Sequence, residues 1–292
     1  LLSLGPSIGS VELRAESNFE LSGGFGPNQV STALGYFATL LVFARLNRQH
    51  LTLSRGLDYF LLLLILFRAL LTFSRGGVFA FVFTMLATAF AMMILSGSFR
   101  KNIAKFAIHL LAVLSLGIFT FFATNKLTDN WLMYRYMGVA TSEVVTGREK
   151  LDHSYLSGRE RIADEELELF KENWLTGVGA GMSRVSREAF SRETIVSASH
   201  SEFSRLLAEH GALGVLAAVL LLVWLPLQRI SRSQSVLSKQ FFLLFFIMGC
   251  MTMLHAAMRL ALPGVIVGFA FAIIISVASH NAATGGGAKL RG

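Results

Sequence analysis

Residues 77–96 read GVFAFVFTMLATAFAMMILS, a stretch that contains no ionisable side chain. About 20 apolar residues in an α-helix are enough to cross the ~30 Å hydrocarbon core of a bilayer. Similar unbroken apolar stretches recur along the 292 residues, 53% of which are hydrophobic. A soluble domain of this length would instead show its apolar residues as periodic stripes. The sequence therefore predicts an all-α integral membrane protein.

We predict about seven transmembrane helices, at 28–44, 57–73, 77–96, 103–123, 206–227, 240–257 and 261–279. These divide the chain into an N-terminal transmembrane part with four spans, a long loop, a C-terminal transmembrane part with three spans and a flexible tail, at 1–123, 124–199, 200–279 and 280–292. Because the chain begins with Leu1 and shows no signal-peptide pattern, we expect that further N-terminal segments precede it.

The short connections between these spans predict the orientation of the chain. On one side the basic residues are Arg45, Arg48, Arg55, Arg100, Lys101, Lys105, Arg229, Arg232, Lys239, Lys289 and Arg291. Asp58 is the acidic residue that faces them. By the positive-inside rule this side is cytoplasmic, so the long loop 124–199 lies outside the cytoplasm. The net charge of +8 is then a topology signal, and no nucleic acid is expected as a partner.

The long loop contains one strong helix signal. In SGRERIADEELELFKENW (157–174), Ser157 and Glu160 form a capping box, and acidic residues concentrate in the first turns. One face of the predicted helix carries an apolar stripe made of Ala163, Leu167, Phe170 and Trp174. An amphipathic helix of this kind suits the membrane surface or the other spans. Arg159 lies one turn before the stripe, on the same face.

The glycine-rich stretch LTGVGAGMS (175–183) follows this helix. It resembles a phosphate-binding loop, but no strand signal precedes it and no P-loop lysine follows it. A re-entry turn is the favoured interpretation. The chain also lacks an HExxH motif, a Cys/His cluster and a DxD triplet. We therefore expect no metal and no cofactor.

Several arginines lie where a bilayer makes them costly. Arg68 and Arg75 are seven residues apart around the end of the second span, a spacing that predicts one helical face. Arg259 follows His255 by one turn at the end of the sixth span. Arginine at the centre of a span costs about 2.5–3.5 kcal/mol. Arg75 and Arg259 could each reach the headgroups instead. Taken together, arginines with almost no nearby carboxylate indicate an anionic ligand, such as a lipid phosphate or diphosphate.

Ionisable residues crowd the start of the fifth span. We expect Ser197 or Ser199 to cap a helix that begins near His200. On this helix Arg205 is predicted to pair with both Glu202 and Glu209. A stripe made of His200, Ser204, Leu207 and Gly211 is predicted to face a packed surface.

His200 itself has two interpretations. An imidazole with a pKa near neutrality can accept a proton from a hydroxyl group that is about to attack. Alternatively, His200 is a histidine at a helix start with no catalytic role. The residues alone leave both interpretations open.

Three motifs together resemble the bacterial O-antigen ligase/polymerase superfamily. They are SRGG (74–77), SGRxR…LFKENWLTGVGAG (157–181) and HSEFSRLLAEHGALGVL (200–216), and GGFGPNQVS (23–31) resembles the upstream part of the family. These motifs cover about 28–279 in the order expected for the family. Ser201 stands where the family usually has Asn, and Trp174 stands where it usually has Pro.

The resemblance implies a GT-C-like lipid-linked glycosyltransferase of the bacterial inner membrane. Such an enzyme transfers a glycan from undecaprenyl diphosphate, at the periplasmic face and with inversion, to a hydroxyl group on lipid A-core, a growing glycan or another acceptor. It is expected to need no metal and no nucleotide. By motif, Arg75 and Arg159 would bind the diphosphate, and His200 would deprotonate or orient the acceptor. Position alone adds Arg68, Arg205 and Arg259 as candidate diphosphate ligands.

Two other functions are compatible with a membrane protein of this composition. A transporter or flippase for an anionic lipid-linked substrate would need ionisable residues near the middle of the membrane and an internal repeat. Here the charges gather at one face and no repeat is found, which favours the enzyme. A purely structural membrane subunit would not explain the set of arginines.

Overall fold

The computed structural model describes residues 11–47, 49, 51–101, 103–139, 141–146, 159–188, 199–233, 235–255 and 261–271, with the side chains of 105, 159, 262 and 263 not described. The described part is all-helical. Its N-terminal helices are α1 Pro27–Leu46, α2 Arg55–Leu71, α3 Arg75–Leu95, α4 Gly97–Lys101 and α5 Ile103–Leu127. The middle helices are α6 Trp131–Met137, α7 Thr141–Thr146, α8 Arg159–Glu172 and α9 Ser183–Glu188. The C-terminal helices are α10 Glu202–Val219, the π-helical turn η2 Leu220–Trp224, α11 Leu225–Arg232, α12 Val236–His255 and α13 Leu262–Ala270.

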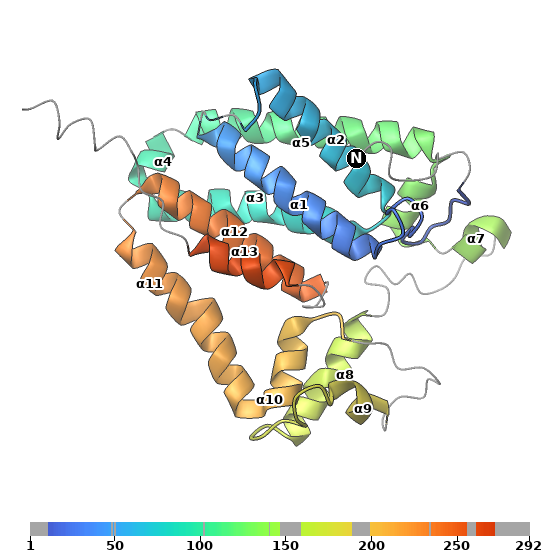
Figure 1. Ribbon diagram of the computed structural model, residues 1–292, viewed down its shortest axis with the longest axis vertical. Coiled ribbons are helices and arrows are strands. Elements are labelled where there is room, and N and C mark those ends of the chain that lie inside the picture. Colours follow the sequence, from blue (N-terminus) through green and yellow to red (C-terminus); the bar gives the residue numbers. More distant parts are fainter. Residues whose placement is uncertain are drawn as a thin grey trace, which may run out of the picture.

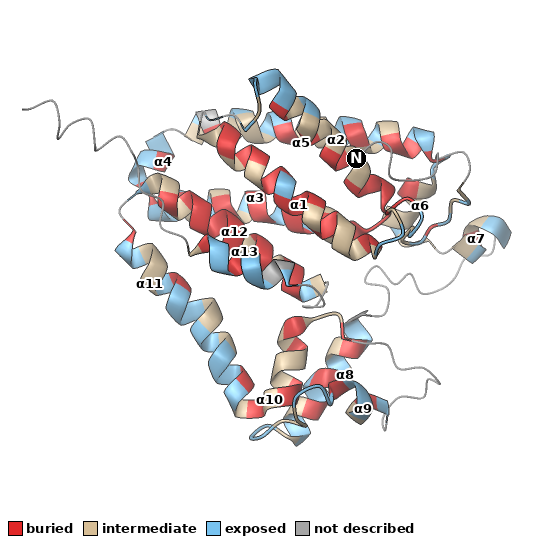
Figure 2. Cartoon of the chain, viewed as in Figure 1, coloured by how far each residue is buried: buried red, intermediate tan, exposed pale blue. Residues whose placement is uncertain are grey.

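A bundle of long helices forms the body of the molecule (Figure 1). Helix α1 packs against α2, α3 and α12, and α12 packs in turn against α3 and α13. Aromatic edge contacts join α1 to α12, with the Phe43 ring 5.3 Å from that of Phe241 and 6.4 Å from that of Phe245. Figure 2 shows that the buried residues gather on the inward faces of these helices. Large apolar side chains remain exposed on the outer faces, as expected for helices that face lipid.

Five helices in the described part are long and apolar enough to cross a membrane. They are Pro27–Leu46, Arg75–Leu95, Phe106–Leu127, Glu202–Arg232 and Val236–His255. Each coincides with one of the predicted spans. The predicted span 57–73 corresponds to α2, which has 17 residues and is slightly shorter than the other five. Most of the predicted span 261–279 lies outside the described residues, which end in this region at Phe271.

The chain reverses direction sharply between α2 and α3. Phe73 adopts a positive φ of 55°, and the Ser74 backbone N–H donates to Thr72 Oγ1 at 3.1 Å. A bulky residue with positive φ cannot continue a right-handed helix. Arg68 therefore lies in the last turn of α2, which ends at Leu71, and Arg75 begins α3. The prediction that these two arginines share one helical face is wrong, because the helix is broken between them.

Helices α8, α9 and the start of α10 lie together beside the bundle, and α11 leads back to the bundle where α12 begins (Figure 1). Helix α8 packs against α10. The helical path from Glu202 to Arg232 is not continuous, because Gly211 has φ 54° and ψ −130° and breaks it. Helices α1 and α3 begin at one end of the bundle, and α2 and α12 terminate there. We call it the loop end.

Candidate functional site

The SRGG motif, Ser74–Gly77, is packed tightly at the loop end. A Cβ atom on Gly76 would overlap the imidazole ring of His255, and one on Gly77 would overlap Ser31. The Ser74 hydroxyl donates to Asn28 Oδ1 at 2.7 Å. Gly77 thus allows the backbone of α3 to lie directly against that of α1, and Gly76 leaves room for the imidazole of His255 between α3 and α12.

His255 connects three helices at this end. Its Nδ1 lies 2.8 Å from the Met251 carbonyl oxygen, and its Nε2 lies 3.3 Å from Thr32 Oγ1. A carbonyl can only accept, so Nδ1 donates, and in the neutral ring Nε2 then accepts from the threonine hydroxyl. Sequence reasoning noted His255 only as a neighbour of Arg259, which lies outside the described residues.

Arg75 is the first residue of α3, and its side chain is buried. Its Nη1 donates to the Arg135 carbonyl oxygen at 3.2 Å. Arg135, on α6, donates in turn from Nε to the Phe73 carbonyl oxygen at 3.0 Å and from Nη2 to Ser17 Oγ at 3.1 Å. The arginine of the SRGG motif is therefore held by a structured turn. No sequence pattern points to Arg135, because the partners that the structure describes for it here are backbone and hydroxyl oxygens.

His200 precedes α10 and is half-buried. The helix is capped by Ser201, whose side chain accepts from the Ser204 backbone N–H at 3.5 Å. The predicted cap at Ser199 is wrong because that hydroxyl is bonded elsewhere, and Ser197 lies outside the described residues.

A buried carboxylate lies against residues 199–204, which we call the His200 segment. Glu166 of α8 is 0% exposed, and its Oε2 accepts from Ser204 Oγ at 2.6 Å and from Ser199 Oγ at 3.1 Å. Its Oε1 lies 3.8 Å from Nε of Arg187, a residue of α9 that is 1% exposed. Burial raises the pKa of the Glu166 carboxyl, while the two serine hydrogen bonds and the Arg187 charge oppose this shift and nearby Glu209 adds to it. Sequence reasoning missed this residue.

The face of α8 that contacts α10 differs from the predicted apolar stripe. The buried residues are Ile162, Glu166 and Leu169. Of the predicted stripe, Leu167 and Trp174 are exposed, whereas Ala163 and Phe170 are half-buried. The face that holds α8 to α10 is therefore the neighbouring one, and contact of the stripe with a membrane surface stays a prediction.

The glycine-rich loop after α8 is fastened to the break in α10. The Val178 and Gly179 backbone N–H groups donate to the carbonyl oxygens of Ala208 and Glu209, at 2.9 and 3.1 Å. Across the break, the Ala212 N–H donates to the Leu175 carbonyl oxygen at 3.2 Å.

Two glycines make this contact possible. A Cβ atom on Gly177 would overlap the Glu209 carbonyl, and one on Gly211 would meet the Gly177 backbone. The loop N–H groups satisfy carbonyls that α10 leaves without helical partners, so they are not arranged around a phosphate. The interpretation of this stretch as a turn therefore agrees with the structure.

The His200 segment and the SRGG motif are linked through α12. Phe203, three residues after His200, packs against the hydrophobic core of the bundle. Helix α10 contacts α12, whose last residue, His255, packs on Gly76. Both motifs are therefore joined to the same helix of the bundle.

The other predicted arginines have different surroundings. Arg205 is ion-paired with Glu202, as predicted, but the predicted Arg205–Glu209 pair does not form. Glu209 accepts from Ser183 Oγ at 2.8 Å instead. Arg68 is half-buried and makes no hydrogen bond or ion pair within the described part of the chain. Arg159 begins α8, but the position of its side chain is not described.

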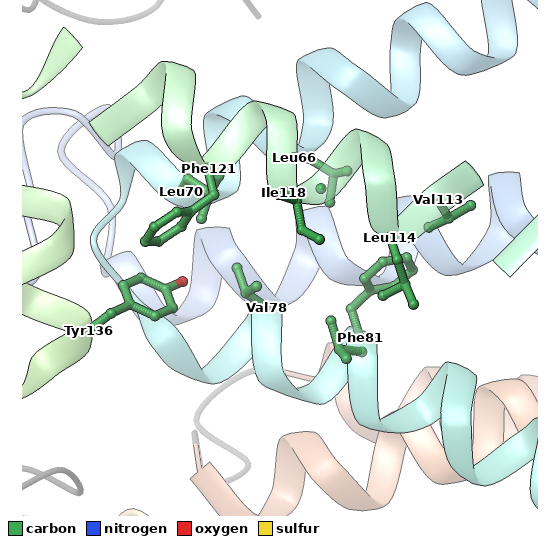
Figure 3. A pocket seen from close by; sticks show the side chains of 11 residues that line it. Leu66, Leu70, Val78, Phe81, Val113, Leu114, Ile118, Phe121 and Tyr136 are labelled. Atoms are coloured by element: carbon green, nitrogen blue, oxygen red, sulfur yellow. The ribbon is translucent and has the colours of Figure 1, made fainter. Parts of the chain in front are cut away.

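An apolar cavity of about 180 Å³ lies between α2, α3 and α5 (Figure 3). Its walls include Leu70, Val78, Phe81 and Ile118, and Tyr136 of α6 points its hydroxyl into one end. This hydroxyl is buried and has no hydrogen-bond partner in the described structure. Burial raises the pKa of Tyr136, against the nearby charges of Arg75 and Arg135.

Among the described residues, no group of three His, Cys, Asp or Glu side chains is placed to hold a metal ion. The sequence profile of the O-antigen ligase family matches residues 60–219, more than half of the chain. No curated protein and no solved structure matches the sequence of this chain. The profile spans the SRGG motif, the α8 helix with its glycine-rich loop, and the His200 segment, and it confirms the resemblance seen in the sequence. The chain is therefore a member of the O-antigen ligase family, an integral membrane enzyme of the glycosyltransferase type.

Proposed function

We propose that this protein transfers a glycan from undecaprenyl diphosphate to an acceptor hydroxyl at the periplasmic face of the bacterial inner membrane. The transfer inverts the anomeric centre and uses no metal. The observation that carries this proposal is that α12 contacts both the SRGG motif, through His255, and α10, the helix that follows His200. The membership of the family implies glycan transfer from a lipid-linked donor.

Charge is the basis for the proposed role of the arginines. Arg75 stands at the first turn of α3, where the helix dipole also favours an anion. The diphosphate is the leaving group, so guanidinium groups stabilise the negative charge that grows as the glycosidic bond breaks. Arg75 and Arg159 are the proposed principal ligands. Arg68, Arg205 and Arg259 are the proposed additional ones.

His200 is the proposed base. Placed on the acceptor side, it accepts the hydroxyl proton as the oxygen attacks the anomeric carbon from the face opposite the diphosphate. This geometry inverts the configuration, because attack and departure occur on opposite faces of the sugar.

The lipid tail is the proposed occupant of the cavity in Figure 3. Its walls between α2, α3 and α5 are apolar, and its Tyr136 end lies near Arg75. A lipid whose chain enters this cavity would have its headgroup close to that guanidinium. Other membrane lipids could occupy the same space when substrate is absent.

The proposed topology keeps all seven spans. Helix α2 and residues 261–279 complete the five spans already described. The proposed division remains 1–123, 124–199, 200–279 and 280–292, with the loop end facing the periplasm. The acceptor is lipid A-core for a ligase, a growing glycan for a polymerase, or another hydroxyl-bearing molecule.

The test of this proposal is glycan transfer by purified protein in detergent. We expect His200→Ala to abolish transfer at unchanged membrane abundance, and His109→Ala in α5 to serve as a matched histidine control. A detergent solution has no second compartment, so glycan transfer observed there cannot be explained by a flippase. Full activity of His200→Ala would show that His200 is not the base. Deletion in the source organism then separates the acceptors: long unattached chains indicate a ligase, and single repeat units indicate a polymerase.

A further inference from the structure

Glu166 is the buried acid of the described loop helices that contacts the His200 segment. Its Oε2 bonds Ser199 immediately before His200 and Ser204 one turn after it, at 3.1 and 2.6 Å. One carboxylate oxygen therefore accepts hydrogen bonds from a serine on each side of the histidine in the sequence. No other carboxylate hydrogen bond to the His200 segment is seen from outside α10 in the described structure.

The other carboxylate oxygen of Glu166 faces Arg187. Arg187 of α9 places its Nε 3.8 Å from Glu166 Oε1 and donates from Nη1 to Glu165 Oε2 at 3.5 Å. Leu169 and Ile162 bury the α8 face above and below it. A fully buried carboxyl group cannot reach a substrate, so any contribution to transfer must act through the residues that it contacts.

Burying a carboxyl group is unfavourable unless its hydrogen bonds compensate. A leucine at position 166 would continue the apolar stripe of Ile162 and Leu169 and seal α8 to α10 without that cost. The acid therefore has a use that an apolar side chain would not serve. That use is a directional bond to the two serines, because dispersion contacts do not fix the rotation of a hydroxyl group or the path of a helix start.

We propose that Glu166 is the positioning residue for His200: it fastens the start of α10 to α8 and so fixes where the imidazole stands. This inference rests on the proposed role of His200 as the base. The glycine-rich loop fastens the other end of the same short helical segment, at Ala208 and Glu209. The segment 202–210 is thus held at both ends by the polypeptide that precedes it.

The first test measures position without activity. In a Cys250→Ser background, which removes the single native cysteine, His200→Cys is labelled with a membrane-impermeant maleimide. We expect Glu166→Ala to raise the labelling rate about tenfold and Glu166→Gln, which keeps an acceptor oxygen, to change it less than about threefold. Val145→Cys on α7, which is exposed, is the control and should label equally in all backgrounds. An unchanged rate at position 200 in Glu166→Ala overturns the proposal.

The second test measures transfer with His200 in place. We expect Glu166→Ala to lower kcat about tenfold with little change in the KM for the lipid-linked donor, and Glu166→Gln to retain most activity. Glu168→Ala is the matched control, because this glutamate is exposed on the same helix and, among the described residues, pairs only with Lys171. An unchanged kcat in Glu166→Ala overturns the proposal. If His200→Ala is fully active while the labelling at position 200 still depends on Glu166, the base has been misassigned, but the positioning contact stands.

Discussion

Arg75 combines a structural contact with the proposed binding of a diphosphate. One guanidinium N–H donates to the carbonyl oxygen of Arg135, so the orientation of the planar group is set by α6. A lysine would keep the charge but would lose this fork-shaped geometry.

We expect Arg75→Lys to be nearly as harmful as Arg75→Ala, with a loss of kcat/KM of about 100-fold for either. The measurement is the rate of glycan transfer by purified variants over a range of donor concentrations. Arg184→Lys, at an exposed arginine of α9, is the control and should remain fully active. Full activity of Arg75→Lys would show that charge alone suffices.

Glu166 also predicts a dependence of stability on pH. Burial raises the pKa of its carboxyl in the folded protein. The folded state therefore binds the proton more tightly than the unfolded state, and this stabilisation is present at low pH and is lost as pH rises through the folded-state pKa. The facing charged groups are Arg187 of α9, Glu165 of α8, which pairs with that arginine, and Glu209 of α10.

We expect the unfolding temperature of the native protein to fall as pH rises above the range in which a glutamate ordinarily ionises, and to fall less in Glu166→Gln, which cannot ionise. Thermal unfolding in detergent, followed by intrinsic fluorescence, measures both. Glu168→Gln is the matched control and should follow the native curve. Equal slopes for the native protein and Glu166→Gln would contradict a raised pKa at this position.

At the scale of elements, α8 shows what hydrophobic patterning can and cannot predict. The sequence predicts the helix, because a capping signal and a 3.6-residue period are local properties. It did not predict which face would be buried, since the buried stripe contains a glutamate and a search for apolar residues passes over it. The two serine partners of Glu166 lie more than 30 residues away in the chain, so only the fold brings them to the carboxylate.

The joint between the glycine-rich loop and α10 gives a prediction about two glycines. Gly177 and Gly181 both have positive φ, but only Gly177 lies against another backbone, that of Glu209. We expect Gly177→Ala to suffer both strain and overlap and to destabilise the α8–α10 contact, whereas Gly181→Ala suffers strain alone. Limited proteolysis of the loop should be about tenfold faster in Gly177→Ala than in Gly181→Ala. Equal rates would show that the joint does not depend on close backbone approach.

At the scale of the whole molecule, the long spans follow directly from composition, because a bilayer requires ~20 apolar residues and a helix. The connections at the loop end, and those between α8 and α10, do not follow from composition. Arg135, His255 and Glu166 each bind carbonyl or hydroxyl groups, which have no counterpart in the charge pattern.

The proposed topology predicts which face of the membrane each connection occupies. In a Cys250→Ser background, Leu53→Cys between α1 and α2 and Val145→Cys on α7 are both exposed in the structure. We expect an impermeant maleimide to label position 145 in intact spheroplasts, and to label position 53 only after the membrane is disrupted. Labelling with the opposite pattern would place the loop end in the cytoplasm.

The break at Gly211 has a consequence for how the chain inserts. From Ala212 to Arg232 a helix measures about 31 Å, which already matches the hydrocarbon thickness. Glu202, Arg205 and Glu209 therefore need not enter the hydrocarbon for this helix to cross it. The break at Gly211 separates the charged residues 202–210 from a helix that has no ionisable side chain before Arg229, so inserting that helix carries no cost for burying these charges.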